Sequence, residues 1–247
     1  MRSNRLSFEV VTTMVAVVLG GLGSPSFADD NTTTGEKLVG SGNAATEARE
    51  VEEFTEISVS TAIKLDVTVG PAIAIAVTAD DNILPHVKTE VVSGRLKLYV
   101  DTSCSSKLGV KIQLATPALR GLRGSGAAKI TVADASGERF RLGLSGASQC
   151  RWKGGVDALV LKIDGGSQAT VSGSAGRLDM NCSGASKVNA QELTAKTAKV
   201  VISGASTARV NASEDLDVNA SGASTLKYAG QPKVEQNVSG ASRVSGE

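Results

Sequence analysis

The sequence predicts an all-β protein whose main part is a right-handed parallel β-helix, a solenoid with SGAS corner repeats of about 19 residues. Small apolar residues must fill the core, because only 3% of the residues are aromatic, while Gly is frequent (27) and Pro scarce (5). Apolar and polar residues also alternate over much of the chain, which is typical of strands. The tetrapeptide SGAS recurs in the second half, at Ser145, Ser183, Ser203, Ser221 and Ser239.

The amino-terminal segment predicts export. Residues 1–28 read as a signal peptide, with Arg2 and Arg5 before an apolar run and small residues, in SPSFA, before the expected cut. An uncleaved anchor is the alternative, although the run is short for a membrane span. Residues 29–50 are polar and are expected to be a flexible leader. The exported protein would then have no transmembrane span and would reach the periplasm, the cell surface or the medium.

The predicted single domain, residues 51–247, starts with strands that are not repeats. From Phe54 the apolar residues recur at every second position over 57–69 and 73–77, then again over 96–100 and 110–114. The turn sequence ADDN and a short apolar cluster around His86 separate the second run from the third.

Tandem repeats occupy residues 120–247. With SGAA at Ser125 and DGGS at Asp164 included, seven copies follow one another at steps of 20, 19, 19, 20, 18 and 18 residues. A β-propeller or a sandwich is the alternative fold, but propeller repeats run to about 40 residues and sandwiches show no such tandem copy. The repeat length therefore favours the β-helix.

A burial pattern holds in register through the copies. Positions five and seven after the start of the tetrapeptide are apolar or small, as in Ile130 and Val132, and the positions around them are polar. Positions one, three and five before it are nearly all apolar, with Gln236 as an exception. Each unit is thus predicted as a strand, a corner, a second strand and an arc of variable length. Such a unit must stack on its neighbours at about 4.8 Å to bury its apolar face.

The repeated tetrapeptide is interpreted as a corner and not as a catalytic serine. Its glycine would allow a positive φ, its alanine would fit a tight interior, and its serine hydroxyls would bond backbone groups of the turn. A nucleophilic serine needs one base beside it, and the chain has a single histidine. The predicted corner glycines are Gly126, Gly146, Gly165, Gly184, Gly204, Gly222 and Gly240.

Several segments together resemble a known family. They are EFTEISVSTAIKLDVTVG, ADDNILPHVKTEVVSGRLKLYV, VKIQLATPALRGLRGSGAAKITV and the tandem SGAS units, in this order. In this order they are similar to the head GIN domain family, described as "putative auto-transporter adhesins", over roughly residues 50–247. The resemblance implies an exported β-helical domain whose molecular function is not established.

The predicted binding surface is a basic strip on the outward side of the second strands. The strip contains no Asp or Glu, whereas the outward positions of the first strands mix Arg141, Lys162 and Lys199 with Asp179, Asp217 and Glu235. An extended anionic polymer would suit the strip. The alternative is that these charges only keep the face soluble and prevent sheet aggregation. The basic strip consists of Lys129, Arg151, Lys187, Arg209, Lys227 and Arg243.

The remaining candidate residues favour structural roles. Trp152 and Tyr228 fall in an inward column, so they are expected in the core. His86 has no partner at metal-ligand spacing, so neither a metal site nor a cofactor is expected. Cys150 and Cys182 belong to different walls of the predicted solenoid and are expected not to form a disulfide. The role of Cys104 stays open.

The sequence therefore favours an exported, non-enzymatic, adhesin-like module that contacts anionic polysaccharide or another envelope component. A polysaccharide-acting enzyme is one alternative, but Asp157, Asp164, Asp179 and Asp217 occupy different offsets, so no carboxylate pair can be placed on one face. A self-assembly module, as a homo-oligomer, is another. The net charge is only +1, and no nucleic-acid partner is expected.

Overall fold

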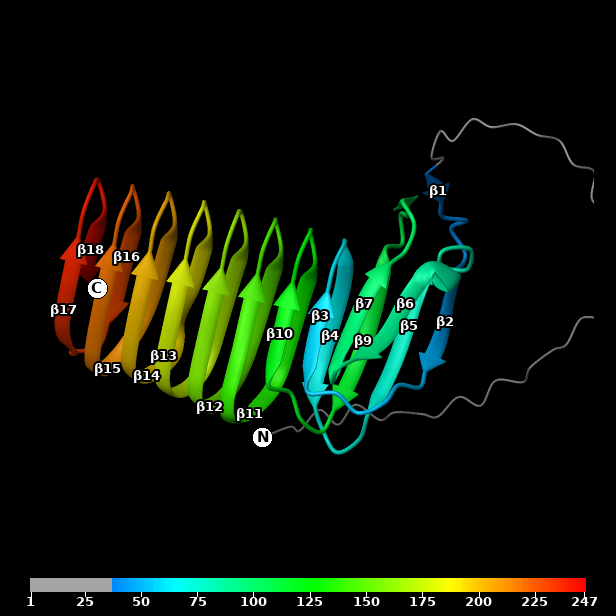
Figure 1. Ribbon diagram of the computed structural model, residues 1–247, viewed down its shortest axis with the longest axis horizontal. Helices are drawn as coiled ribbons and strands as arrows, with labels where there is room; N and C mark the ends of the chain where they lie inside the picture. Colours follow the sequence, from blue (N-terminus) through cyan, green and yellow to red (C-terminus); the bar gives the residue numbers. More distant parts are fainter. Residues whose placement is uncertain (1–36) are drawn as a thin grey trace, which may run out of the picture. The chain divides into compact units, whose positions relative to one another are not determined.

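The computed structural model describes residues 37–247, which belong to one compact unit. The predicted signal peptide and residues 29–36 of the predicted leader lie outside the described residues. Within the described part, parallel strands stack along one axis, and the chain winds as a right-handed β-helix (Figure 1). Neighbouring coils are about 19 residues apart in the chain, as the pairing of Gln149 with Gln168 shows.

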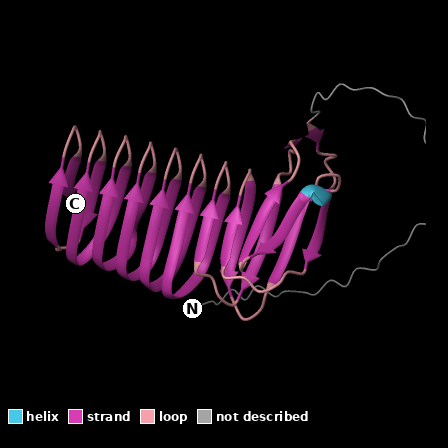
Figure 2. Ribbon diagram, viewed as in Figure 1, coloured by secondary structure: helices cyan, strands magenta, loops and turns pink. Residues whose placement is uncertain are grey.

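Five long strands form the regular part of the β-helix, and each makes almost a whole coil. Phe140 pairs with Leu159, and Leu159 with Leu178, so equivalent positions of the repeat lie on top of one another. Loops interrupt these coils only at the tetrapeptides, along one edge of the stack (Figure 2). The strands are β11 (Lys129–Leu144), β12 (Gln149–Ile163), β13 (Gln168–Cys182), β14 (Lys187–Ile202) and β15 (Thr207–Ala220).

In β11 to β15 the predicted arc of the unit is itself part of a hydrogen-bonded strand. Register shifts occur in this region between β11 and β12 (Val132/Ala135), between β13 and β14 (Thr170/Ser172), and at two places between β14 and β15. These irregularities absorb the variation in repeat length without disturbing the walls. The arc is therefore the variable part of the repeat, as predicted, but it remains part of the sheet.

The turns stack through backbone hydrogen bonds. The N–H of Ala205 donates to the carbonyl oxygen of Gly184 at 2.8 Å, and the other turns repeat this bond. A Cβ atom added at Gly204 would lie 2.4 Å from that same oxygen. Glycine is required here for its conformation too, since the seven corner glycines have φ between 69° and 77°.

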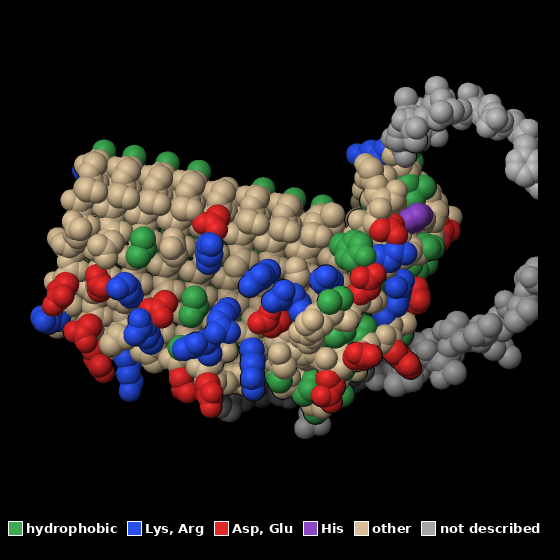
Figure 3. All heavy atoms as spheres, viewed as in Figure 1, with side chains coloured by type: hydrophobic (Ala, Val, Ile, Leu, Met, Phe, Trp, Pro, Cys, Tyr) green, Lys and Arg blue, Asp and Glu red, His purple; other side chains and the backbone are tan. Residues whose placement is uncertain are grey.

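The turn side chains differ from the prediction at two positions. The third residue, such as Ala147 or Ala205, is exposed, and a row of apolar side chains follows this edge in Figure 3. The fourth residue is buried instead: the Ser186 hydroxyl lies 2.7 Å from the Ser183 carbonyl oxygen and 3.1 Å from that of Ile163. The prediction of an inward alanine is wrong, because the inward position is taken by the serine that bonds the turn carbonyls. The predicted bonding of serine to the turn is confirmed.

Two coils before the repeats stack in an order that differs from their order in the chain. One consists of β3 (Glu56–Val59) and β4 (Ile63–Val69), the other of β7 (Arg95–Val100) and β9 (Val110–Thr116). The β3–β4 coil lies between the β7–β9 coil and the coil of β10 (Gly121–Gly124) and β11.

The turn of the β3–β4 coil contains a residue under strain. Thr61 has a φ of 67°, the conformation that glycine adopts in the later turns. Its backbone nitrogen lies 3.1 Å from the place of a Cβ on Gly126, so this turn continues the stack of turns.

Antiparallel strands close the stack beyond the β7–β9 coil. β5 (Ala74–Asp80) pairs with β9 and with β2 (Ala44–Arg49), and β6 (Val87–Val92) pairs with β7. The short 3-10 helix η1 (Leu84–His86) leads into β6. β1 (Leu38–Val39) pairs in parallel with β8 (Cys104–Ser105).

The expectation that residues 29–50 form a flexible leader is wrong for its second half, which contains β2. β2 pairs with β5 along its full length, and the Arg49 guanidinium donates to the carbonyl oxygens of Val87 at 3.1 Å and Leu84 at 3.3 Å. The strand is polar because it lies at an edge with much of its surface in solvent, so backbone pairing holds it without apolar periodicity.

At the other end, the last coil consists of β16 (Thr225–Ala229), β17 (Lys233–Val238) and β18 (Arg243–Gly246). β17 pairs with β15 and β18 with β16, and no strand within residues 37–247 pairs with their outer edges. Burial decreases accordingly, and Val238 is 40% exposed.

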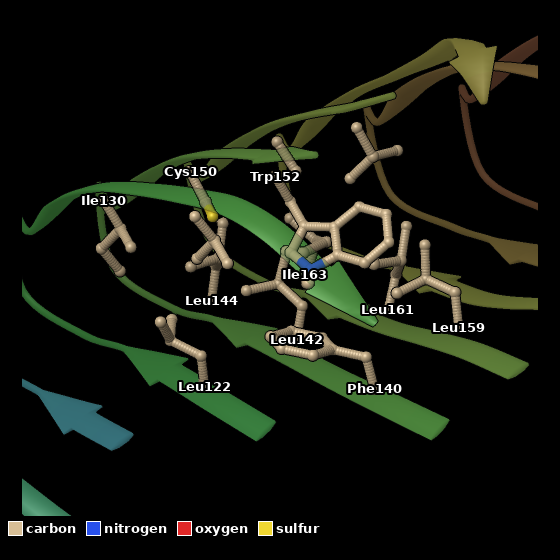
Figure 4. Close-up of a cluster of buried hydrophobic side chains, with 14 of the residues drawn as sticks. Leu122, Ile130, Phe140, Leu142, Leu144, Cys150, Trp152, Leu159, Leu161 and Ile163 are labelled. Carbon is tan, nitrogen blue, oxygen red and sulfur yellow. The ribbon is translucent and has the colours of Figure 1, made fainter. Parts of the chain in front are cut away.

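The core lies between the two walls of the coils, as the predicted burial pattern requires. Figure 4 shows Trp152 on one wall and Phe140, Leu142 and Leu161 on the other, with Leu122 further along the stack. The rings of Phe140 and Trp152 lie 5.5 Å apart between centroids in a tilted arrangement. Apolar side chains from both walls thus fill the interior, with few aromatic residues.

Candidate functional site

The basic strip lies on the outward side of the wall that follows the turns. Lys129, Lys187 and Arg243 share one column, whereas Arg151, Arg209 and Lys227 share the next. Gln149 and Gln168 separate Lys129 from Lys187. All six side chains are exposed except that of Lys227, which is half-buried. The strands thus bring the predicted residues onto one face, at spacings set by the strand separation of about 4.8 Å.

Strand pairing adds two lysines that the sequence reasoning missed. Lys129 pairs with Lys64 of β4, and Lys64 pairs with Lys111 of β9, so three lysines stand side by side in one column. The alternation of apolar and polar residues in IKLDV and VKIQL is enough to predict that Lys64 and Lys111 point outward. Without a tetrapeptide to align on, however, these strands could not be placed in register with the repeats. We call Lys111, Lys64 and Lys129 the lysine column.

A shallow depression of about 200 Å³ lies beside the lysine column. Lys64, Lys129 and Arg151 line it together with Gln149 and Gln168. These groups offer ammonium, guanidinium and amide N–H donors to one ligand, and anionic oxygens accept from all of them.

Two carboxylates lie among the cations of this wall, which corrects the expectation of a single-sign surface. Lys64 lies 3.8 Å from Asp66, and the Glu247 carboxylate lies 3.3 Å from Arg209 and 3.5 Å from Lys227. Lys129, Arg151 and Lys187 make no ion pair with any residue of the described part. Glu247 therefore compensates only Arg209 and Lys227, and Arg243 likewise makes no ion pair within residues 37–247.

The other candidate residues have structural surroundings. Trp152 is buried in the core as predicted, and Tyr228 is half-buried against Gly246. His86 Nδ1 lies 2.9 Å from Asp101 Oδ1, a partner that the sequence reasoning missed, and Lys88 lies 3.0 Å from the same carboxylate. These contacts hold the pKa of Asp101 below its ordinary value, chiefly through the His86 hydrogen bond.

All three cysteines are free, as expected for Cys150 and Cys182. Cys104 is partly buried, whereas the other two are buried in the core. Burial raises the pKa of the Cys150 thiol to about 12. It also raises the pKa of Cys182 to about 12, with a smaller contribution from the nearby Asp164 carboxylate. These thiols are packing residues, because a reactive cysteine needs a lowered pKa.

Residues 37–247 contain no cluster of three His, Cys, Asp or Glu side chains that could hold a metal ion. Within the same residues, no helix has the length and apolar character needed to cross a membrane.

Solved structures share this fold at low sequence identity. A "putative adhesin" from Bacteroides fragilis NCTC 9343 is 19% identical, with a TM-score of 0.80 over 85% of this chain and 100% of that chain. A "putative adhesin" and a "putative lipid binding protein" from Parabacteroides distasonis ATCC 8503 are 19% and 20% identical, with TM-scores of 0.75 and 0.70. Each covers 86% of this chain and 100% of its own. At these identities the likeness shows the fold alone.

No curated protein matches the chain. The family described as "Putative auto-transporter adhesin, head GIN domain" matches residues 53–232, which include the antiparallel strands β5 and β6 and all the coils up to β16. The match covers most of the chain, and the chain therefore belongs to the head GIN domain family.

Proposed function

We propose that this chain is an exported, non-enzymatic surface-binding module that holds an extended anionic polymer of the cell envelope along its basic strip. Membership of a family named for adhesins supports surface binding, and the β-helix supplies a long, regular face. The single observation that carries the proposal is the run of exposed cations that the strand register places on one wall, on every strand from β9 to β14 except β13. It extends from the lysine column through Arg151 to Lys187.

The strip suits repeated weak contacts better than one strong contact. An exposed ion pair contributes only about 0.2–1 kcal/mol, because water and salt screen it. A polymer that bridges several such positions gains from each of them with little additional entropy loss once the first contact is made. Amide groups of Gln149 and Gln168 fill the interval between cations and can donate to sugar hydroxyls or carboxylates.

The test is binding of the purified protein to acidic and neutral polysaccharides by biolayer interferometry, over a range of salt concentrations. Acidic polymers should bind and neutral ones should not. Binding should weaken steeply as salt rises, because the Debye length falls from about 10 Å at 0.1 M to about 3 Å at 1 M. The combined variant Lys129→Gln, Arg151→Gln and Lys187→Gln should bind about tenfold or more weakly.

A matched variant controls for net charge. Arg177→Gln, Lys199→Gln and Lys233→Gln remove three exposed cations from the opposite wall, where each is paired with a carboxylate. This variant should bind the polymer as the original protein does. If both variants bind equally, or if no acidic polymer binds, the strip only keeps this face soluble. Light scattering of the same samples distinguishes polymer binding from self-assembly.

Export is tested separately. Mass spectrometry of the protein from its own cells should find a chain that begins near Asp29, as the apolar run and SPSFA predict. Recovery of an intact Met1 would contradict cleavage.

A further inference from the structure

On the wall opposite the basic strip, ion-paired charges and unpaired cations lie in different halves along the axis. In the carboxyl-terminal half, three acidic residues on the outward side of this wall have a basic partner on the same wall. The pairs are Arg177–Asp179 at 2.9 Å, Lys199–Asp217 at 3.3 Å and Lys233–Glu235 at 3.1 Å. The cations of these three pairs are therefore compensated.

The other half of this wall has cations without an ion pair, and three of them lie close together. Arg123, Arg141 and Lys162 are exposed and make no ion pair with any residue in 37–247. Arg123 and Lys162 pair with Gly143 from opposite sides, and Arg141 lies two residues before that glycine on β11. The three side chains thus surround one position on three neighbouring strands, which are about 4.8 Å apart.

Glycines hollow the surface at this point. Gly121 and Gly143 occupy outward positions and have no side chain, so a depression of about 550 Å³ opens between the cations. Ser125 and Ser145 add hydroxyl groups to its lining. Basic side chains gather over β10, β11 and β12 in Figure 3, which shows this wall. We call the depression the glycine hollow.

Two carboxylates line the glycine hollow, and both are engaged by other groups. Glu56 Oε2 accepts from Arg95 Nε at 2.9 Å and from Arg95 Nη2 at 2.5 Å. The pKa of Glu56 is lowered mainly by this bond, and also by the charges of Arg123 and Arg141. Asp164 accepts from the Ser183 hydroxyl at 2.5 Å. With Arg95 included, basic groups outnumber acidic groups by four to two around the hollow.

We propose that the glycine hollow binds a phosphate monoester carried by a saccharide-sized ligand. A phosphate monoester has close to two negative charges and three strong acceptor oxygens, which match two guanidinium forks and one ammonium group. The volume of about 550 Å³ leaves room for a sugar ring beside the phosphate. This site goes beyond the proposed polymer binding, because it lies on the other wall and takes one compact group.

The test is isothermal titration of the purified protein with glucose 1-phosphate, inorganic phosphate and glucose. Glucose 1-phosphate should bind more tightly than inorganic phosphate, and glucose should not bind. Arg141→Gln should weaken binding about tenfold, as expected for loss of a charge-assisted hydrogen bond. Flotation with phosphatidic acid vesicles, against phosphatidylcholine vesicles, then distinguishes a lipid-borne monoester from a soluble sugar phosphate.

A second variant fills the hollow without removing charge. A Cβ on Gly143 would meet only the Arg123 Cγ atom, at an ordinary contact distance of 3.6 Å. Gly143→Val should therefore fold and yet abolish binding. Asn219→Val, in the same outward column but three coils beyond Lys162, is the matched control and should bind normally.

The outcomes separate this site from the strip. Loss of phosphate-ester binding in Arg141→Gln and Gly143→Val, with binding kept in Asn219→Val and in the strip variant, supports the proposal for either source of the ester. The proposal is overturned if neither glucose 1-phosphate nor the phosphatidic acid vesicles bind, or if Gly143→Val binds as the original protein does. Polymer binding should be unchanged in both hollow variants, so failure of one proposal leaves the other testable.

Discussion

At the scale of single residues, each corner glycine meets two requirements at once. It adopts a positive φ, and from Gly146 onward a Cβ atom would lie only 2.4–2.8 Å from the carbonyl oxygen of the neighbouring turn, which excludes a side chain. The buried serine two positions later contributes only hydroxyl contacts, such as Ser206 Oγ to the Gly184 carbonyl oxygen at 3.3 Å. The two positions should therefore differ in their tolerance of substitution.

We expect Gly204→Val to lower the free energy of unfolding by about 3 kcal/mol or more, through backbone strain and the clash with Gly184. Ser206→Ala should cost about 1 kcal/mol, the typical loss of one hydrogen bond. Urea denaturation of both variants measures the difference. Equal losses would contradict the assigned role of the glycine.

Thr61 offers the reverse experiment, because it holds a β-branched side chain in the left-handed region. Thr61→Gly should raise the free energy of unfolding by about 1 kcal/mol, since relief of strain exceeds the added entropy of the unfolded chain. Thr68→Gly, at an exposed position within β4, should lower it by about 0.5–1 kcal/mol. A destabilised Thr61→Gly variant would show that the turn does not store strain.

The buried thiols predict a dependence of stability on alkaline pH. The pKa values of Cys150 and Cys182 rise from 9.0 to about 12 on folding, so the unfolded chain loses these protons first as pH increases. Stability should be unaffected by these groups below about pH 9 and should fall between about pH 9 and 12. Urea denaturation under reducing conditions at pH 8 and pH 10.5 measures the fall. The Cys150→Ala, Cys182→Ala variant should show a smaller decrease over the same interval.

The direction of a side chain could be predicted where the alternating pattern repeats. It could not be predicted where tertiary contacts set the direction. The alternation around Ile130 and Val132 was enough to assign inward and outward sides. The direction of Ala147 and Ser148 could not be derived in the same way, because a turn has no period of two. The position of Glu247 beside Arg209 also lay outside the pattern, since it depends on where the chain passes after β18.

At the scale of elements, the wall of each coil keeps its strand register, whereas the arc accommodates register shifts. Residues 213–215 in the arc of β15 are exposed, and the pairing with β14 shifts register nearby, between Ala195 and Thr197. The wall before the next turn keeps full register from Leu216 to Ala220. Inserted residues should therefore have very different effects at the two places.

One glycine inserted after Ser213 should cost less than about 1–2 kcal/mol, because the arc already accommodates repeats of different length. The same insertion after Val218 would reverse the inward and outward directions of the residues before the turn, and should destabilise the coil severely. Urea denaturation and limited proteolysis would compare the two. Similar stabilities would contradict the division into wall and arc.

Element order shows the limit of sequence reasoning. The strands at 57–69, 96–100 and 110–114 were predicted from their periodicity, but nothing in that periodicity indicated that β7 and β9 would lie outside β3 and β4. The polar strand β2 was missed because its pairing with β5 uses backbone groups, which have no compositional signal. The lysine column was also missed, because the three lysines come together only through the pairing of β4 with β11 and of β9 with β4. This strand pairing likewise has no compositional signal.

At the scale of the whole molecule, the basic strip and the glycine hollow lie on opposite walls with the packed core between them. A ligand on one wall therefore touches no group on the other. We expect glucose 1-phosphate to bind with the same affinity, within about twofold, whether or not the strip is saturated with polymer. Titration with and without the polymer measures this. A larger change would indicate coupling through the core or an overlap of the two ligands.

The inverted order of the first coils also affects how the structure can form. A chain that emerges amino end first, from a ribosome or a secretion channel, presents β3 and β4 before any of the strands that flank them. Both neighbours arrive later, the last of them with Lys129–Ala133 of β11, which pair with β4. The β3–β4 coil therefore cannot pair on both sides until the chain has emerged as far as Ala133, whereas every coil after β11 can add to a finished template as soon as it appears.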